Sequence, residues 1–288
     1  MGRPRKRFGQ HWLRDQKILQ KIVEAATIEK CDRVLEIGPG QGILTKSLVS
    51  LSDTVIAVEI DRDLCRTLNI QFEKDARFHL IQGDILDLDL DNLLSNQPDV
   101  HPPDIQHPNI QHPNIQHPNK VVANIPYYIT GPLLEKLLGR IRQPNPRPFD
   151  SIVLLLQKEV ADRLYAPPGT KTFGALSVRV QYLADCELIC PVPAKSFKPP
   201  PKVESAVVRL RPRPFPMQAQ NPKLLEQLVK VGFSQKRKML RNNLKGLINR
   251  DQITDHLEAM ALNPQARAED LSVPSWVTLS NRVSEMMK

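Results

Sequence analysis

Residues 33 to 51, RVLEIGPGQGILTKSLVSL, join a short apolar strand to a helix through a glycine-rich turn. The apolar run at 33–38 has the length of a buried strand, and helical spacing begins at residue 42. Glycine tolerates the conformations of a tight turn and lets a ligand approach the main chain. The stretch therefore predicts a strand–turn–helix unit with space for a ligand beside the turn.

The same alternation of strand and helix extends in both directions from this unit. A helix is expected at 15–28, where Asp15 caps a face formed by Ile18, Leu19, Ile22, Val23 and Ala26. Another helix follows Asp61, a third follows Thr130 over 131–141, and a fourth begins after residue 170. Further strands are expected at 54–60, 77–84, 120–124, 151–157, 186–192 and 205–211. The pattern predicts an α/β fold with a mostly parallel sheet, whose binding crevice lies at the carboxyl ends of the strands.

The segment at 98–119 interrupts this alternation with a repeat of five residues rich in proline and histidine. In an extended proline-rich segment, a spacing of five places successive histidines roughly 15 Å apart and on different sides. His107, His112 and His117 therefore do not converge on a metal ion. We interpret the segment as an extended or disordered surface insertion, and we expect no metal site.

The chain after the prolines at 212–222 reads as a small, all-helical second domain over 212–288, following a first domain over 1–211. The most regular of its expected helices covers 234–248, with Met239, Leu240, Leu244, Leu247 and Ile248 on its inner face. Its outer face would carry five cations: Lys236, Arg237, Lys238, Arg241 and Lys245.

Charge is concentrated in a few segments of the chain. The net charge is +9, yet residues 198–250 hold thirteen basic and only two acidic residues, and residues 1–8 add four basic ones. Such segments on a mildly acidic body indicate a polyanionic partner, most simply a nucleic acid, the alternative being a solvated basic surface. No apolar run is long enough for a membrane span, and the N-terminus lacks the apolar part of a secretory signal.

Four cysteines, at positions 31, 65, 186 and 190, fit a reducing compartment. We read Cys186 and Cys190, on one expected strand, as buried or half-buried thiols.

Three consecutive strand ends carry residues suited to a nucleoside. Gly38, Gly40 and Gly42 form a GxGxG turn, which differs from the GxGxxG of dinucleotide-binding proteins. Glu59 ends the next strand, where a carboxylate can accept hydrogen bonds from ribose hydroxyls. Asp84, after the third strand, can reach an adenine amino group. Together they predict a nucleoside site.

The stretch VVANIPYYIT, 121–130, brings a different chemistry to the same crevice. Asn124 offers an uncharged acceptor. Pro126 rigidifies the turn, and Tyr127 supplies a flat face for stacking. This set suits an exocyclic amine on a planar base.

Taken together, these stretches resemble a known family, the S-adenosylmethionine-dependent dimethyltransferases of adenines in small-subunit ribosomal RNA. The resemblance covers nearly the whole chain and rests on RKRFGQHWL, EIGPGQG, VEID, QGDIL, NIPYYIT, LLLQKEVADRL, FGALSV, SFKPPPKVESAVVRL and FSQKRKMLRNNL. It implies a Rossmann-like methyltransferase domain. The cofactor-binding residues that it implies are His11, Leu13, Gly38, Glu59, Asp84 and Asn124. The target amine would be held by Asn124, Ile125, Pro126 and Tyr127, and Phe197 would help to stack the flipped adenine. His11 stands where such proteins often have asparagine.

The resemblance further implies dimethylation of two adjacent adenines near the 3′ end of small-subunit RNA, during assembly of the subunit. Binding of the RNA would involve Tyr127, Phe197, Lys236, Arg237, Lys238 and Arg241. We expect a cytoplasmic monomer that acts on a pre-small-subunit particle and has no membrane partner. Three alternatives stay open: a large-subunit RNA methyltransferase of the macrolide-resistance type, an NAD-dependent oxidoreductase, and an RNA-binding assembly factor with a vestigial site.

Overall fold

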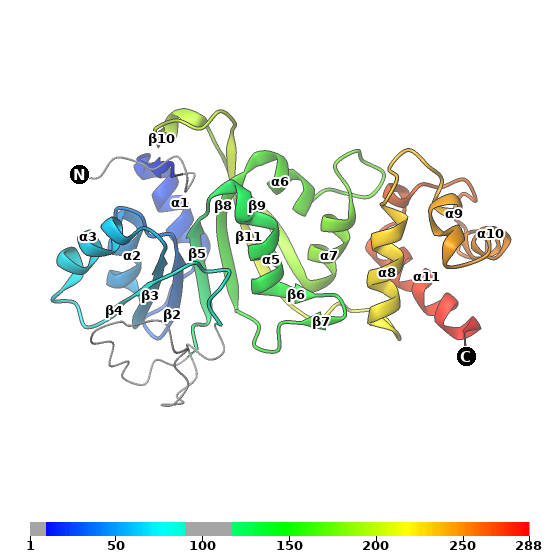
Figure 1. The fold of residues 1–288 in the computed structure, drawn as a ribbon, viewed down its shortest axis with the longest axis horizontal. Helices are drawn as coiled ribbons and strands as arrows, with labels where there is room; N and C mark the ends of the chain where they lie inside the picture. Colours follow the sequence, from blue (N-terminus) through cyan, green and yellow to red (C-terminus); the bar gives the residue numbers. More distant parts are fainter. Residues whose placement is uncertain (1–9, 90–116, 288) are drawn as a thin grey trace. The chain divides into compact units, whose positions relative to one another are not determined.

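The computed structural model describes residues 10–89 and 117–287, which form two compact units (Figure 1). Unit 1 comprises 1–133, 149–155 and 192–202, and unit 2 comprises 134–148, 156–191 and 203–288. These bounds divide the chain within the α/β part, so the division at 211 and 212 stays a prediction. In the described part of the chain, every helix is too short or too polar to cross a bilayer.

Unit 1 is built on parallel strands whose spatial order is β4-β3-β2-β5-β8. The strands are β2 (Arg33–Ile37), β3 (Thr54–Glu59), β4 (Phe78–Gln82), β5 (Lys120–Asn124) and β8 (Ser151–Gln157). Each lies within two residues of its predicted position, and the expected α/β fold with a mostly parallel sheet is confirmed. Ile37 pairs with Val58 on one side and with Ala123 on the other. The residues after these strands therefore meet at one edge.

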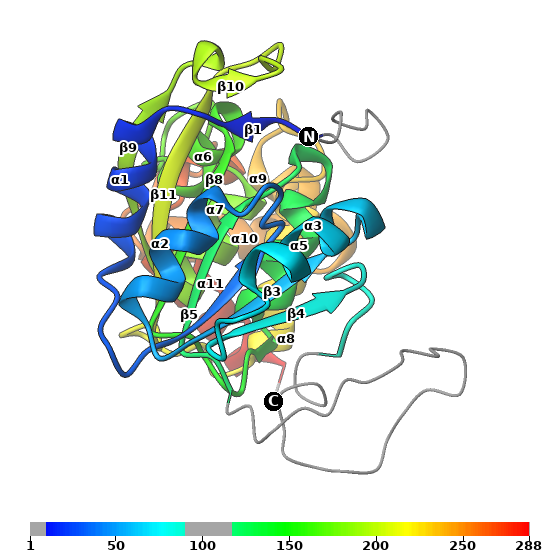
Figure 2. The ribbon, with the colours of Figure 1, turned by 90° about the vertical axis from the view of Figure 1, so that its left-hand side faces the viewer.

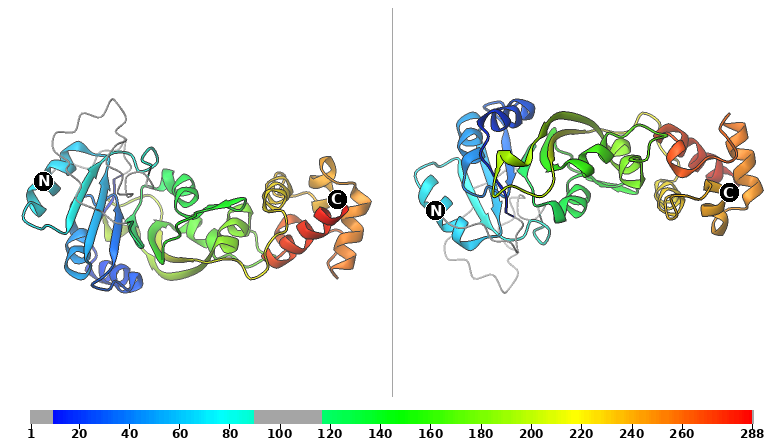
Figure 3. Two further views of the ribbon diagram at one scale, coloured as in Figure 1. Left: turned by 90° about the horizontal axis from the view of Figure 1, so that it is seen from below. Right: turned by 90° about the horizontal axis from the view of Figure 1, so that it is seen from above.

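Three helices cover the sheet of unit 1. They are α1 (Gln16–Ala26), α2 (Ile43–Leu51) and α3 (Arg62–Phe72). Figures 2 and 3 show α1 and α2 on one face of the sheet and α3 on the other. Asp15 and Asp61 cap α1 and α3 as predicted, since each carboxylate accepts a main-chain N–H of the first turn. On α1 the buried face includes Ala25, whereas Val23 is only half-buried.

The N-terminal segment at 10–15 is attached to a segment almost 190 residues later. Strand β1 (Trp12–Leu13) pairs antiparallel with β10 (Phe197–Lys198), just after the 3₁₀ turn η3 (Ala194–Ser196). The main-chain N–H of Arg14 donates to the carbonyl of Ser196 at 2.8 Å, and the hydroxyl of Ser196 donates to Asp15 at 3.0 Å. The capping residue of α1 is thus also part of this attachment.

Strand β5 is anchored at its beginning by Asn119. The side-chain oxygen of Asn119 accepts the N–H of Arg33 at 2.9 Å, and its amide nitrogen donates to Asp32 at 2.6 Å. Lys120 forms a buried ion pair of 2.6 Å with the same carboxylate. These contacts fix the register between β2 and β5 at the edge opposite to Asn124.

The helix predicted at 131–141 begins one residue earlier, at Thr130, and ends three residues sooner, at Leu138. A 3₁₀ turn, η2 (Tyr127–Ile129), leads directly into α5 (Thr130–Leu138). Thr130 is therefore inside the helical run, where its hydroxyl donates to the carbonyl of Tyr127 at 3.0 Å, and its prediction as a cap is wrong. Gly139, with φ of 80°, ends the helix, and the short hairpin of β6 (Gly139–Arg140) and β7 (Gln143–Pro144) follows.

Unit 2 combines α6 (Lys158–Leu164) and α7 (Ala175–Leu183) with the neighbouring strands β9 (Ala184–Val192) and β11 (Ser205–Pro212). Every element of regular secondary structure in the described residues after 212 is a helix, as predicted. The elements are α8 (Pro222–Gly232), α9 (Leu240–Asn243), η4 (Leu244–Gly246), α10 (Arg250–Ala259), η5 (Ala268–Asp270) and α11 (Val273–Met286). Their core contains the fully buried Trp276, whose ring lies 5.7 Å from that of Phe233.

The continuous helix predicted at 234–248 is absent from unit 2. Residues 234–239 form turns, and only α9 and η4 are helical. Met239 pairs with Arg267 in an isolated β-bridge, and the N–H of Leu240 donates to the carbonyl of Ala266. The amide of Asn243 donates to the carbonyls of Gly232 and Gln235. In these contacts, main-chain N–H and C=O groups form hydrogen bonds outside a helix, although a continuous helix would have paired such groups internally. The predicted core residues Leu240, Leu244 and Ile248 are nevertheless buried.

Most of the predicted insertion at 98–119, with His107 and His112, lies outside the described residues. His117 is described: its carbonyl accepts from Arg33, and its ring lies 5.5 Å from that of Phe149. Within 10–89 and 117–287, no three histidine, cysteine or acidic residues are grouped as metal ligands. None of the four cysteines, all of them in the described ranges, forms a disulfide. Cys186 is half-buried and Cys190 is buried on β9, which confirms that prediction.

Candidate active site

A hollow of about 790 Å³, including solvent-filled space at its mouth, lies in unit 1 at the carboxyl ends of β2, β3, β4 and β5. The predicted site residues that line it are His11, Gly38, Gly40, Glu59, Asp84, Asn124, Ile125, Pro126 and Tyr127. The sheet register brings these distant positions together because parallel strands end at a common edge.

The turn after β2 places main chain, rather than side chains, at the floor of the hollow. Gly38 and Gly40 have φ values of 69° and 58°, a region that favours glycine. The N–H of Gly40 donates to Glu59 at 3.1 Å, and the N–H of Asp61 donates to the other oxygen of that carboxylate at 3.0 Å. Glu59 is held in one orientation by the turn and by the start of α3. Burial raises the pKa of Glu59 above its usual value.

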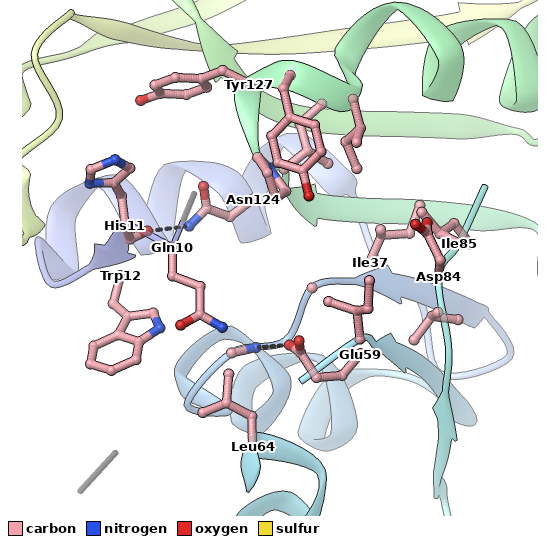
Figure 4. A pocket seen from close by; sticks show the side chains of 18 of the residues that line it. Gln10, His11, Trp12, Ile37, Glu59, Leu64, Asp84, Ile85, Asn124 and Tyr127 are labelled. Atoms are coloured by element: carbon pink, nitrogen blue, oxygen red, sulfur yellow. Dashed lines mark hydrogen bonds between the residues drawn. The ribbon is translucent and has the colours of Figure 1, made fainter. Parts of the chain in front are cut away.

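Asp84 lies on the same side of the pocket as Glu59 (Figure 4). One oxygen of its carboxylate accepts the N–H of Leu86 at 2.9 Å, as expected in a turn that follows a strand. The apolar residues Ile37 and Ile85 line the pocket beside it. This side combines two carboxylates with apolar walls, which suits a planar base linked to a sugar.

Asn124 lies on the other side of the pocket, at the end of β5, together with His11 and Tyr127 (Figure 4). Its amide nitrogen donates to the main-chain carbonyl of His11 at 3.2 Å. Since the nitrogen is committed to this bond, the amide oxygen is the atom that can accept a proton donor from a ligand. The predicted uncharged acceptor is therefore present, and its orientation comes from the N-terminal segment.

Two aromatic rings occupy this side of the pocket. The imidazole of His11 and the phenol ring of Tyr127 are nearly parallel, with 6.2 Å between their centroids and 16° between their planes. The Nδ1 atom of His11 lies 2.8 Å from the carbonyl oxygen of Pro199. A carbonyl oxygen can only accept, so Nδ1 carries the proton in this bond.

Among the predicted site residues of unit 1, Leu13 and Phe197 do not line this pocket. Leu13 is 5% exposed and lines a smaller neighbouring cavity together with Glu36 and Leu44. Phe197 is 4% exposed and pairs with Leu13 across β1 and β10. Contact of Leu13 with a cofactor and stacking of Phe197 on a base both stay predictions.

Several pocket residues were missed by sequence reasoning. Gln10 lines the pocket and donates to Asp61 at 3.1 Å, and Trp12 lines both cavities with a buried indole nitrogen that has no acceptor in the described ranges. Both stand in the stretch GQHWL, so the residues flanking His11 were a usable signal. Tyr128, 63% exposed, also lines the pocket.

Sequence reasoning also missed Glu36, whose carboxyl group lies inside the apolar strand β2. It is 1% exposed on β2 and lines the smaller cavity. Burial, with the negative charge of Glu59 as a lesser cause, raises the pKa of Glu36 to about 8. The glutamate between Leu35 and Ile37 could have been noticed in the sequence, since a charged residue rarely occupies such a strand unpaired.

The predicted RNA-binding cations lie in unit 2. Lys236, Arg237 and Lys238 are exposed in the turn that precedes α9, and Arg241 is half-buried within α9. The amine of Lys236 donates to the carbonyl of Lys171. Lys236, Arg237 and Lys238 therefore extend from a compact turn and not from a helix.

Comparisons with known proteins show which family the chain is similar to. A family model described as "Ribosomal RNA adenine dimethylase" matches residues 1–285. A protein of Trichormus variabilis named "Ribosomal RNA small subunit methyltransferase A" is 59% identical over 98% of both chains. A protein of the same name from Nostoc punctiforme is 58% identical over 99% of this chain and 96% of its own.

Among solved structures, a dimethyladenosine transferase from Plasmodium falciparum is similar with a TM-score of 0.73, at 26% identity over 96% of this chain and 98% of its own. The 23S rRNA methyltransferase ErmE is similar with a TM-score of 0.69, at 25% identity over 95% of this chain and 99% of its own. With the match of the family model over nearly its full length, the chain belongs to the ribosomal RNA adenine dimethylase family.

Proposed function

We propose that this protein transfers methyl groups from S-adenosylmethionine to the exocyclic amines of two adjacent adenines in the 3′-terminal hairpin loop of small-subunit ribosomal RNA. The observation that carries the proposal is the amide of Asn124 at the end of β5. Its nitrogen is bound to the carbonyl of His11, and its oxygen is left to accept an amine inside a pocket lined by Glu59 and Asp84.

The residues of the pocket fit S-adenosylmethionine. Glu59, oriented by two main-chain N–H groups, has lone pairs left for ribose hydroxyls. Asp84, Ile37 and Ile85 would hold the adenine of the cofactor, and the exposed main chain at Gly38 and Gly40 would face its methionine portion. We further propose that the main chain near His11 and Leu13 closes this end. When bound, the cofactor supplies a methyl group already activated by its positively charged sulfur.

The protein's part in the reaction is positioning. The Asn124 oxygen would accept one N–H of the target amine, and a carbonyl in the turn at Ile125 and Pro126 would accept the other. Both bonds favour a pyramidal nitrogen, whose lone pair would form the new bond to the methyl carbon as the carbon–sulfur bond of the cofactor breaks and its electron pair stays on the sulfur. Tyr127 would support the ring of the base. The nitrogen loses a proton to water after transfer, so no strong base is required of the protein.

The substrate class is supported by relatives and by charge. Proteins at 52–59% identity are named for the small ribosomal subunit, whereas ErmE, named for 23S RNA, is 25% identical. The exposed cations Lys236, Arg237 and Lys238, with Arg241, would bind phosphates of the RNA. We propose that the protein acts as a cytoplasmic monomer on a pre-small-subunit particle.

The experiment that tests this function supplies labelled S-adenosylmethionine to unmethylated small subunits and, separately, to large subunits. We expect label in the small subunit only, on two neighbouring adenines near the 3′ end, each carrying two methyl groups. Mapping of the modified nucleotides gives the position. Label in large-subunit RNA alone would replace this proposal with the macrolide-resistance activity.

A further inference from the structure

We propose that the loop between α6 and α7, residues 167–172, belongs to the surface that binds the RNA backbone, with Lys171 as a phosphate-binding residue. The inference rests on the proposed function and goes beyond it, because this loop carries none of the predicted RNA-binding cations. The ligand of the loop is the sugar–phosphate backbone of ribosomal RNA, next to the stretch of that backbone held by the segment at 234–238.

The loop is attached to the helical part of unit 2 that follows residue 212. The main-chain N–H of Gly169 donates to the carbonyl of Glu269 at 2.7 Å. Phe173, which follows the loop directly, is fully buried, and its ring lies 6.3 Å from that of Phe233 at the end of α8. These two contacts give the loop a fixed place beside the segment that follows α8.

The main chain of Lys171 contacts the basic segment directly. The amine of Lys236 donates to the carbonyl of Lys171, so two residues 65 positions apart in the sequence lie next to each other. A carbonyl has no net charge, and a lysine amine has three donors. Lys236 therefore keeps its positive charge and two N–H groups for a ligand. The loop orients Lys236 and brings a further cation, the exposed Lys171, to the same surface.

The charges on this surface are not compensated by acidic side chains. Within 10–89 and 117–287, Lys171, Lys236, Arg237 and Lys238 form no ion pair, whereas other cations of unit 2 do. Arg179, for example, lies 3.0 Å from Glu135. Neighbouring like charges repel one another in the free protein, and a polyanion relieves that repulsion. Four uncompensated cations on two adjacent segments therefore favour a chain of phosphates as the ligand.

The test is Lys171→Ala, which removes the ammonium group and keeps the main-chain carbonyl that binds Lys236. Affinity is measured at several salt concentrations, for unmethylated small subunits and for protein-free small-subunit RNA. We expect a loss of about three- to tenfold at moderate salt, and a slope of log affinity against log salt that is flatter by about one. Because the loop does not line the pocket, kcat at saturating subunits should stay within about twofold, and KM should rise.

Two control variants accompany this measurement. Lys171→Arg keeps the charge and should bind as the wild type does. Lys223→Ala removes an equally exposed lysine at the beginning of α8, about 15 Å along the helix from the end that precedes the basic segment, and should change neither affinity nor slope. Unchanged binding by Lys171→Ala would overturn the inference, as would equal losses in Lys171→Ala and Lys223→Ala. A loss with subunits but not with protein-free RNA would also overturn it, because it would point to a ribosomal protein as the ligand.

A double variant separates a direct contact from mere support of Lys236. If Lys171 binds a phosphate of its own, Lys171→Ala should have the same effect in a Lys236→Ala background, with the slope again flatter by about one. Loss of that effect would show that Lys171 acts only through Lys236. Wild-type protein that neither binds nor methylates small subunits would contradict the proposed function, whereas an active wild type with an unaffected Lys171→Ala contradicts this inference alone.

Discussion

The pocket of unit 1 and the basic segment of unit 2 were both predicted from short motifs, but they are built in different ways. The pocket residues follow parallel strands that end at the same edge of the sheet. A motif at the end of such a strand therefore lies in the site. Segment 234–245 has no such frame. Its backbone is shaped by Ala266 and Arg267, and by the end of α8.

The difference shows what a local pattern can and cannot specify. The register of a buried parallel strand is fixed by its neighbours, which pair with it residue by residue. Helical spacing in a short basic segment predicts a helix only weakly. Hydrogen bonds to distant parts of the chain can override that prediction. The pocket should therefore be sensitive to single atoms, whereas the basic segment should respond to its summed charge.

Asn124→Ala should produce the largest effect. We expect a loss of about 100- to 1000-fold in kcat on small subunits, because a preorganised acceptor for the amine is removed. The fold should persist, with an unchanged midpoint of thermal unfolding. Asn69→Ala, on the exposed side of α3, is the matched control. Unchanged turnover by Asn124→Ala would remove this residue from the site.

Glu36→Gln tests the buried carboxyl beside the pocket through the pH dependence of stability. The folded-state pKa is raised from 4.5 to about 8 by burial. Between these values the unfolded chain releases a proton that the folded chain keeps, so wild-type stability falls as pH rises. The amide has no such proton. The advantage of Glu36→Gln over the wild type should therefore grow by about 2 kcal/mol or more between pH 5 and pH 8.

Denaturant unfolding of both proteins at the two pH values measures this difference. Because other titrating groups are shared, they cancel in the comparison. Parallel curves for the wild type and Glu36→Gln would show that Glu36 is ionised in the folded protein throughout this range.

Reversal of Lys236, Arg237 and Lys238 to glutamate should weaken binding to small-subunit RNA by about 10-fold or more at moderate salt. The slope of log affinity against log salt should flatten by roughly two to three. Filter binding at several salt concentrations gives both values. Reversal of Lys17, Lys21 and Lys46, which are exposed in α1 and α2, is the matched control. Equal effects of the two triple variants would show that the segment contributes only nonspecific positive charge to RNA binding.

Asn243→Ala should have a smaller effect, confined to the shape of the basic segment. The Asn243 amide donates to the carbonyls of Gly232 and Gln235, and its loss should cost about 1 kcal/mol of stability. RNA affinity should fall by only a few-fold. Asn242→Ala, at the adjacent position of α9, should change neither quantity. Thermal unfolding and the same filter assay test the pair.

Deletion of 101–113, within the proline- and histidine-rich segment, should have the smallest effect. We expect methyl transfer within about twofold of the wild type, since the sequence predicts a surface insertion and such insertions tolerate changes of length. A deletion extended through 118 should be more harmful, because His117 and Pro118 contact or lie among residues of unit 1. Loss of activity from the shorter deletion would restore a role for His107 and His112.

Sequence reasoning identified the strands, the capping residues Asp15 and Asp61, and the family, because each depends on a local pattern. It placed eight of the nine predicted cofactor-pocket and amine-holding positions in the pocket, Leu13 being the exception. It could not foresee that Asn124 is oriented by a main-chain carbonyl of His11, since that contact spans 113 residues. The burial of Phe197 and the absence of a helix at 234–239 likewise result from packing between distant segments.

The pairing of β1 with β10 has a consequence for synthesis of the protein. The carbonyl that fixes the His11 ring belongs to Pro199, so translation must continue well past the last pocket-forming strand before the entrance is finished. A nascent chain that ends before residue 199 holds an incomplete site. Methylation is thereby reserved for a polypeptide that is more than two-thirds made.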